Sequence, residues 1–182
     1  MQPDPAVGSD QHIRLHMHLG RDSLLFSLFV ACAAGFVWFT SLGLPGSVAS
    51  HFGTEGIPNG FMSHDAYVGF MLSFVVGFPV LLVVLTWLAM ASPKARIKLP
   101  RGDYWLAHER RAETVARLRN SILRFGVMLE VFLCYAHWLV VLANEANPAR
   151  LSESWFIGGL IVFGGGMLVW LIALLDHFRH GA

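Results

Sequence analysis

Three side chains able to bind or transfer a proton lie inside a long apolar stretch of this sequence. Glu130, Cys134 and His137 are spaced at i, i+4 and i+7, so on a helix they share one face. Glu130 lies about nine residues, or ~13 Å, from the start of that stretch. If the stretch crosses a membrane, an ionised carboxylate at this depth costs at least ~2.5 kcal/mol. Two interpretations stay open: a proton or ligand site, with Glu130 titrating and His137 as relay or second ligand, or a polar cluster that only sets how the helices pack.

A second group of ionisable side chains lies in a glycine-rich segment. His51, Glu55 and His64 are of the types that bind zinc. However, Gly53 and Gly56 interrupt any helix that would place His51 and Glu55 on one face. We therefore expect no metal ion here. We expect instead that His51 and the turn residues hold this segment in one shape through hydrogen bonds.

Residues 12–18 contain a third group of ionisable side chains. His12 and His16 would share a helical face, and neutral imidazoles bind Zn²⁺ or Cu²⁺. No carboxylate or cysteine completes a ligand set there, so we expect an exposed tail with titrating histidines. The sequence also lacks a serine elbow and a glycine-rich phosphate loop after a strand, which are signatures of nucleophilic and phosphoryl-transfer enzymes. We therefore expect neither an enzyme nor a bound cofactor.

The elements that position these side chains follow from the composition. Of 182 residues, 55% are hydrophobic and only 14% are charged. Crossing a ~30 Å hydrocarbon core takes about 20 consecutive apolar residues. Such runs predict an all-α membrane protein in which a mobile tail, residues 1–20, precedes a single four-helix domain, residues 21–182. The four predicted spans cover residues 24–44, 66–91, 121–143 and 155–175.

The distribution of positive charge predicts the topology. Of the 13 Lys and Arg residues, 12 fall in residues 1–21, in residues 92–124 or at the C-terminus, and only Arg150 lies elsewhere. The positive-inside rule places such segments in the cytoplasm. Both termini and the basic segment 92–120 are therefore predicted to be cytoplasmic, and the segment 45–65 to form an outer loop. The rule accounts for the basic cluster without a nucleic acid ligand.

The basic segment should contain an interfacial helix that starts near Tyr104. Asp103 is placed to act as its N-cap, and Glu113 and Arg117 are ordered for an i,i+4 ion pair. Anionic lipid would attract such a helix.

Small residues predict close helix packing. Gly69, Ser73 and Gly77 form a smooth face on the second span, where another helix could approach closely. Pro79 follows and should kink this helix. On the fourth span, pairs at i,i+7, Gly158 with Gly165 and Gly159 with Gly166, indicate another packing face.

The outer loop reads as a shaped binding element. Its glycines permit positive φ, Pro58 restricts φ, and Asn59-Gly60 is a strong turn signal. The candidate binding residues of this loop are His51, Phe52, Gly53, Glu55, Gly56, Pro58, Asn59, Gly60 and His64.

Two motifs resemble a bacterial integral-membrane domain of unknown function. The first is the loop Leu44-Pro45, His51-Phe52-Gly53, Gly56, Pro58-Asn59-Gly60 and Ser63. The second is Leu99-Pro100, Asp103 to Ala107 and Glu109 to Arg111. This domain also occurs at the N-terminus of SdpI-type immunity and signalling proteins, which are longer than this chain. The resemblance implies a bacterial inner-membrane location and an outward loop, and it carries over no catalytic residue.

The sequence thus favours a multi-pass protein of the bacterial inner membrane, in contact with the lipid bilayer, that binds rather than catalyses. The leading hypothesis is a sensing or immunity-like module whose outer loop meets a protein or peptide partner. One alternative is a small proton-coupled carrier built on Glu130 and His137, which would require a homo-oligomer. Another is an accessory subunit of a larger membrane complex.

Overall fold

Four helical segments of the structure are long and apolar enough to cross a bilayer. The computed structural model describes residues 5–91 and 97–180, with side chains from residue 20 onward. Within these residues the candidate spans are Gly20–Ser41, His64–Ala91, His108–Glu145 and Glu153–His180. They confirm the predicted all-α fold with four spans, and they define a multi-pass membrane protein.

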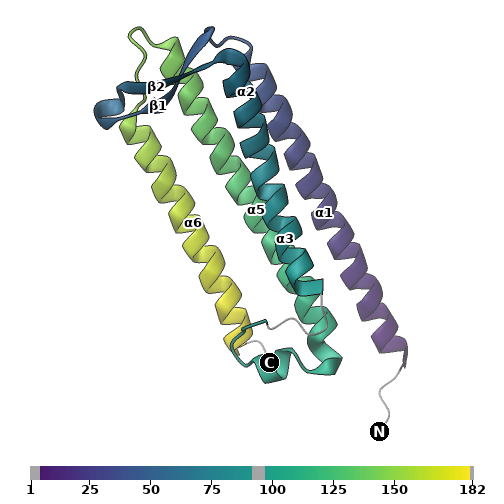
Figure 1. Cartoon of the computed structure of the whole chain (residues 1–182). Helices are drawn as coiled ribbons and strands as arrows, with labels where there is room; N and C mark the ends of the chain where they lie inside the picture. The colour runs from purple at the N-terminus through teal and green to yellow at the C-terminus, as the bar shows by residue number, and fades with distance from the viewer. Residues whose placement is uncertain (1–4, 92–96, 181–182) are drawn as a thin grey trace.

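The elements run as an up-and-down bundle with a small hairpin at one end (Figure 1). They are α1 Pro5–Ser41, β1 Ser47–Phe52, the 3₁₀ turn η1 Thr54–Gly56, β2 Pro58–Ser63, α2 His64–Leu72, the π-helical turn η2 Ser73–Gly77, α3 Phe78–Ala91, α4 Gly102–Trp105, α5 His108–Glu145 and α6 Glu153–His180. The end that carries β1 and β2 is called the hairpin end below. The opposite end, where α4, the start of α5 and the end of α6 meet, is called the charged end.

α1 begins earlier than the sequence suggested. It starts at Pro5, inside the segment that we expected to be a polar tail. The backbone of the His-rich patch, residues 12–18, is therefore part of this helix, and its side chains lie outside the described part of the chain. Lys94 and Arg96 of the basic segment also lie outside it.

The sequence predicted that Pro79 kinks the second span. In the structure, a widened, π-helical turn precedes Pro79. α2 passes through the π-helical turn η2 into α3. Pro79 has no N–H to donate to the carbonyl four residues earlier, and a π-helical turn is one way in which a helix accommodates such a mismatch. Val75, inside this turn, is fully buried against α1 and α5, so the widened turn faces the core.

α5 is the central helix of the bundle. It packs against α1, α3 and α6, and its 38 residues extend for ~57 Å, well beyond the hydrocarbon core. Gly126 of α5 lies where Phe26 of α1 and Val83 of α3 converge, and a Cβ atom there would come within 2.8 Å of the Phe26 ring. This glycine permits the three helices to meet.

α6 stands apart from the other helices and contacts the bundle mainly through α5 (Figure 1). The glycines predicted to form its packing face divide into two sets. Gly159 and Gly166 face Tyr135 and Met128 of α5, whereas Cβ atoms at Gly158 and Gly165 would meet nothing within 4 Å. Only the first pair packs within this chain.

Within the described residues, the face formed by Gly69, Ser73 and Gly77 makes no contact with another helix. Cβ atoms at both glycines would meet nothing within 4 Å, and the Ser73 hydroxyl donates a hydrogen bond of 2.8 Å to the Gly69 carbonyl of its own helix. The three residues lie on the exposed surface of the bundle. Close approach of another helix at this face stays a prediction.

The charged end is closed by a tryptophan. The segment expected to form one helix from Tyr104 divides into α4 and α5, and Arg101 with φ 52° takes the N-cap position of α4 that we assigned to Asp103. Trp105 Nε1 donates to the Phe178 carbonyl of α6 at 2.8 Å, and the Thr114 hydroxyl donates to the Trp105 carbonyl at 2.8 Å. The predicted Glu113–Arg117 pair forms at 3.7 Å.

Candidate functional site

The predicted outer loop forms a β-hairpin, which the sequence analysis did not anticipate. β1 and β2 pair antiparallel, with Ser47 opposite Ser63 and Phe52 opposite Pro58, and the register shifts on either side of His51. A Cβ atom at Gly60 would come within 3.0 Å of the His51 Cβ atom, and one at Gly53 within 3.1 Å of Asn59 Nδ2. These loop residues are therefore glycine because the two strands cross closely.

Asn144, at the end of α5, holds β1 against the bundle. Its Oδ1 atom accepts a hydrogen bond from the Ala49 N–H at 2.8 Å, and its Nδ2 donates to the Ala49 carbonyl at 3.0 Å. The amide side chain thus pairs with β1 much as a neighbouring strand would. This contact occupies both backbone groups of a buried strand residue.

The turn of the hairpin is held by the connection between α5 and α6. The Leu151 N–H donates to the Gly56 carbonyl at 2.9 Å, and Arg150 Nε donates to the Glu55 carbonyl at 2.9 Å. The Arg150 and Glu55 side chains also form an exposed ion pair at 3.8 Å. Gly56 has φ +68° and is packed directly against the Leu151 carbonyl.

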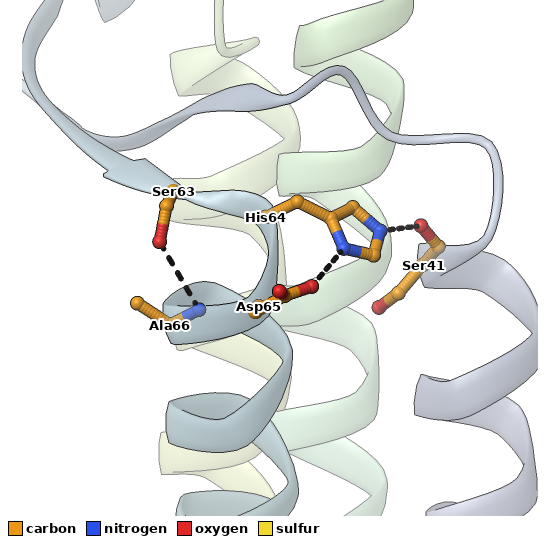
Figure 2. Close-up of polar contacts among 5 residues, drawn as sticks. All are labelled: Ser41, Ser63, His64, Asp65 and Ala66. Atoms are coloured by element: carbon orange, nitrogen blue, oxygen red, sulfur yellow. Dashed lines mark hydrogen bonds and ion pairs between the residues drawn. The ribbon is translucent and has the colours of Figure 1, made fainter.

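His64 joins the base of the hairpin to the end of α1 (Figure 2). Its Nε2 donates to the Ser41 carbonyl at 3.0 Å, and its Nδ1 lies 3.1 Å from Asp65 Oδ1. Both partner atoms are acceptors, so a doubly protonated ring satisfies both contacts. The Ser63 hydroxyl caps α2 beside it by accepting from the Ala66 N–H at 3.4 Å.

The zinc alternative finds no assembled ligand set. His51 contacts the Ser50 hydroxyl at 3.0 Å, Glu55 pairs with Arg150, and His64 is held by Ser41 and Asp65. Among residues 20–91 and 97–180, no group of three His, Cys, Asp or Glu side chains is arranged to hold a metal ion.

Within the bundle, His137 bridges three helices. The Thr40 hydroxyl of α1 donates to the Phe36 carbonyl at 2.7 Å and lies 2.8 Å from His137 Nε2. The Tyr67 hydroxyl of α2 lies 2.9 Å from His137 Nδ1, and the two rings stack. Since Thr40 already donates elsewhere, the network fits an imidazole that donates from Nε2 and accepts from Tyr67 at Nδ1.

Glu130 is buried without a partner. Its side chain is 1% exposed, and neither carboxyl oxygen has a hydrogen-bond partner among the described residues. Leu129 and Leu133, its neighbours on α5, belong to an apolar cluster that includes Val37 of α1 and Val75 of the π-helical turn. An unpaired carboxylate in such surroundings is unfavourable, so the group is stable there only when it is protonated or paired with a cation.

The predicted face of α5 exists, but its members do not form one network. Seven residues separate Glu130 from His137, a rise of ~10.5 Å, and the half-buried Cys134 lies between them. The two partners of His137, which are Thr40 and Tyr67, were not expected from the sequence. Each lies within about two turns of the hairpin end of its own span, and matching polar residues by depth would have found both.

No protein-family model, curated protein or solved structure matches this chain.

Proposed function

We propose that this membrane protein binds a peptide or protein partner at its hairpin and catalyses no reaction. The observation that carries the proposal is a hairpin held by Asn144, Arg150 and Leu151 that nevertheless leaves large apolar side chains in the open. Ile57 is 55% exposed and Phe61 is 62% exposed. Exposed apolar groups on a preorganised element favour binding, because little conformational entropy remains to be lost.

The strand edges support an extended partner. β1 is paired with β2 on one side and held by Asn144 on the other. β2 pairs only with β1 in the described sheet, so its second edge is open to another strand. A peptide that adds there would place its side chains beside Phe61.

The membrane setting of the proposal is the bacterial inner membrane, with both termini in the cytoplasm. The basis is the distribution of Lys and Arg, together with the resemblance of the loop to SdpI-type immunity and signalling proteins. The proposal extends to sensing, because His64 joins the base of the hairpin to Ser41. Ser41 is adjacent in the chain to Thr40, which contacts His137 inside the bundle. Through these contacts, a partner bound at the hairpin would shift the end of α1 and the hydrogen bonds of His137.

Photo-crosslinking in intact cells tests the proposal. The probe is p-benzoylphenylalanine in place of Phe61, and the matched control carries it in place of Val162, an exposed residue of α6. We expect a discrete protein or peptide adduct at position 61 alone, and its loss when Ile57→Ser is added. Equal adducts at both positions, or adducts with lipid only, would contradict the proposal.

The second candidate is a proton-coupled carrier, and the unpartnered Glu130 carboxyl favours it. In proteoliposomes with a trapped pH-sensitive dye, a carrier should lose proton flux in the Glu130→Gln variant and retain it in Cys134→Ser. Four spans are few for a pathway, so this candidate needs a homo-oligomer. An accessory subunit would instead co-purify in fixed stoichiometry with larger partners, whether or not Phe61 and Glu130 are replaced.

A further inference from the structure

A cleft at the charged end, between α5 and α6, has the composition of an anion site. Its volume is about 390 Å³. α5 lines it with Arg117, Asn120 and Arg124, and α6 with Trp170, Leu174 and His177. No carboxylate is among the described residues that line it. The cleft lies at the opposite end of the bundle from the hairpin, so it is independent of the function proposed above.

Two polar atoms in the wall of this cleft lack partners. Asn120 Oδ1 and His177 Nε2 are buried, and neither has a hydrogen-bond partner in the described part of the chain. Buried polar atoms are nearly always paired with protein, water or a ligand. Both residues line the cleft, so its wall carries polar groups whose hydrogen-bonding capacity the described residues leave unused.

The two arginines retain donors for an anion. Arg117 contacts Glu113 and Arg124 contacts Asp22, each at 3.7 Å through Nη2. At 3.7 Å these are loose ion pairs, and the two arginine side chains are 49% and 72% exposed. The Arg117–Glu113 pair is exposed on both sides and is worth little. The Asp22 side chain is only 10% exposed, but the Arg124 guanidinium is largely exposed and has further N–H groups that a phosphate can accept from.

The depth of the cleft matches the lipid headgroups. Arg117 and Asn120 precede the predicted start of the third span at residue 121, and His177 follows the predicted end of the fourth at residue 175. Trp170 and Leu174 lie nearer the bilayer centre, and Trp170 Nε1 donates to the Ser121 carbonyl at 3.2 Å. The polar rim therefore stands at phosphate level, above an apolar floor that acyl chains can cover.

We propose that this cleft binds the phosphate of an anionic phospholipid. Arg117 and Arg124 donate to the phosphate oxygens, and Asn120 and His177 line the site beside them. Basic pockets between membrane helices commonly hold anionic headgroups in this way. The lipid would also bridge α5 and α6 beside the contacts that Trp170 makes with Ser121 and Phe125.

Native mass spectrometry and thermal unfolding of the whole protein in neutral detergent test the proposal. The probes are phosphatidylglycerol, phosphatidylcholine and inorganic phosphate, and each variant is compared with and without the probe. We expect phosphatidylglycerol adducts and a raised unfolding temperature for the unmodified protein. In the double variant Arg117→Gln/Arg124→Gln, we expect the affinity to fall at least about tenfold.

Two further variants separate this site from general attraction to charge. Arg179→Gln removes one exposed charge of α6 outside the cleft and should bind the lipid normally. Leu174→Trp keeps every charge but fills the floor of the cleft and should weaken binding. Unchanged binding in the double variant, or equal binding of phosphatidylcholine, would overturn the proposal. A full effect from inorganic phosphate alone would overturn the assignment to a lipid.

Discussion

Two buried ionisable side chains of α5, His137 and Glu130, differ in their hydrogen bonding. His137 has a hydroxyl partner on each ring nitrogen, from Thr40 and from Tyr67. Glu130 has none. A satisfied buried polar group can stabilise a fold, whereas an unsatisfied one costs ~1–3 kcal/mol. The contacts of His137 thus give it a structural role, whereas no hydrogen bond within the described residues explains why position 130 is a glutamate.

This contrast predicts opposite effects of the same substitution. Glu130→Leu removes an unpartnered polar group from apolar surroundings and should leave the protein equally stable or more stable. His137→Leu leaves the Thr40 and Tyr67 hydroxyls without their partner and should destabilise the fold by about 1–3 kcal/mol. Thermal unfolding in detergent, followed by circular dichroism, measures both. A large loss of stability in Glu130→Leu would mean that Glu130 has a structural partner.

A second prediction concerns the amide that holds β1. Asn144→Ala removes two hydrogen bonds to Ala49, each with a net value of ~0.5–1.5 kcal/mol, and so should cost about 1–3 kcal/mol. Hydrogen exchange at the Ala49 N–H should accelerate by one to two orders of magnitude, on the order that this energy implies. Glu145→Ala, at the exposed neighbouring position, is the control and should change neither quantity.

Residue types and spacing led to Glu130, Cys134 and His137 because helical periodicity within one span is local information. The partners of His137 lie on other helices, 97 and 70 residues away in the chain. Which spans are neighbours, and how each is rotated, depends on packing details such as the fit of Phe26 against Gly126. Those details cannot be read from one span at a time.

Among the elements, the hairpin depends on Gly56, where a side chain would overlap Leu151. Gly56→Ala would place a methyl group onto the Leu151 carbonyl and would force a residue with a side chain to φ +68°. The left-handed conformation alone costs ~1–2 kcal/mol. We expect the turn to detach, with rapid hydrogen exchange at the Leu151 N–H. Gly43→Ala, where a Cβ atom meets nothing within 4 Å, should leave that amide protected.

The helices were predictable and the hairpin was not, for a physical reason. Each span carries its signal in about 20 apolar residues, which is sufficient without knowledge of its neighbours. The sequences of the strands Ser47–Phe52 and Pro58–Ser63 do not alternate between apolar and polar residues, and the register of the pairing shifts around His51. The residues that hold the strands are distant in sequence, because Asn144 and Leu151 follow the second and third spans in the chain. From the sequence we expected hydrogen bonds from His51 and the turn residues to hold the loop, whereas the hairpin is held by Asn144, Arg150 and Leu151, and the His51 side chain hydrogen-bonds only to the neighbouring Ser50 hydroxyl among the described side chains. Its strands were not expected.

The contact of α6 with α5 gives a matched pair of variants. A Cβ atom at Gly159 would overlap the Tyr135 ring, whose hydroxyl donates to the Trp155 carbonyl at 2.7 Å. Gly159→Ala should therefore push α6 away and cost about 1–3 kcal/mol. Gly158→Ala meets nothing within 4 Å and should be neutral. Unfolding temperature and spin-label distances between α5 and α6 report both; equal effects would mean that α6 sits in a different rotation.

At the scale of the whole molecule, the two ends of the bundle differ in kind. The hairpin end is knit by backbone contacts around Ala49 and Gly56 and holds one basic residue, Arg150. The charged end is held by Trp105 and by stacked aromatic and arginine side chains, including Arg110 at 4.0 Å from the Tyr104 ring. One end suits recognition of a partner in water, and the other suits a surface of anionic headgroups.

This asymmetry predicts an absolute orientation in the membrane. In a Cys32→Ser/Cys134→Ser background, a single cysteine is introduced either as Thr54→Cys on the hairpin turn or as Ala112→Cys on α5, both at exposed positions. A membrane-impermeant maleimide applied to intact cells should label the first and reach the second only after the membrane is permeabilised, because 12 of the 13 Lys and Arg residues fall in the sequence segments predicted to be cytoplasmic or next to them. Labelling in the reverse order would place the hairpin in the cytoplasm. The proposed partner at Phe61 would then have to be a cytoplasmic protein, and the outward orientation implied by the family resemblance would be wrong.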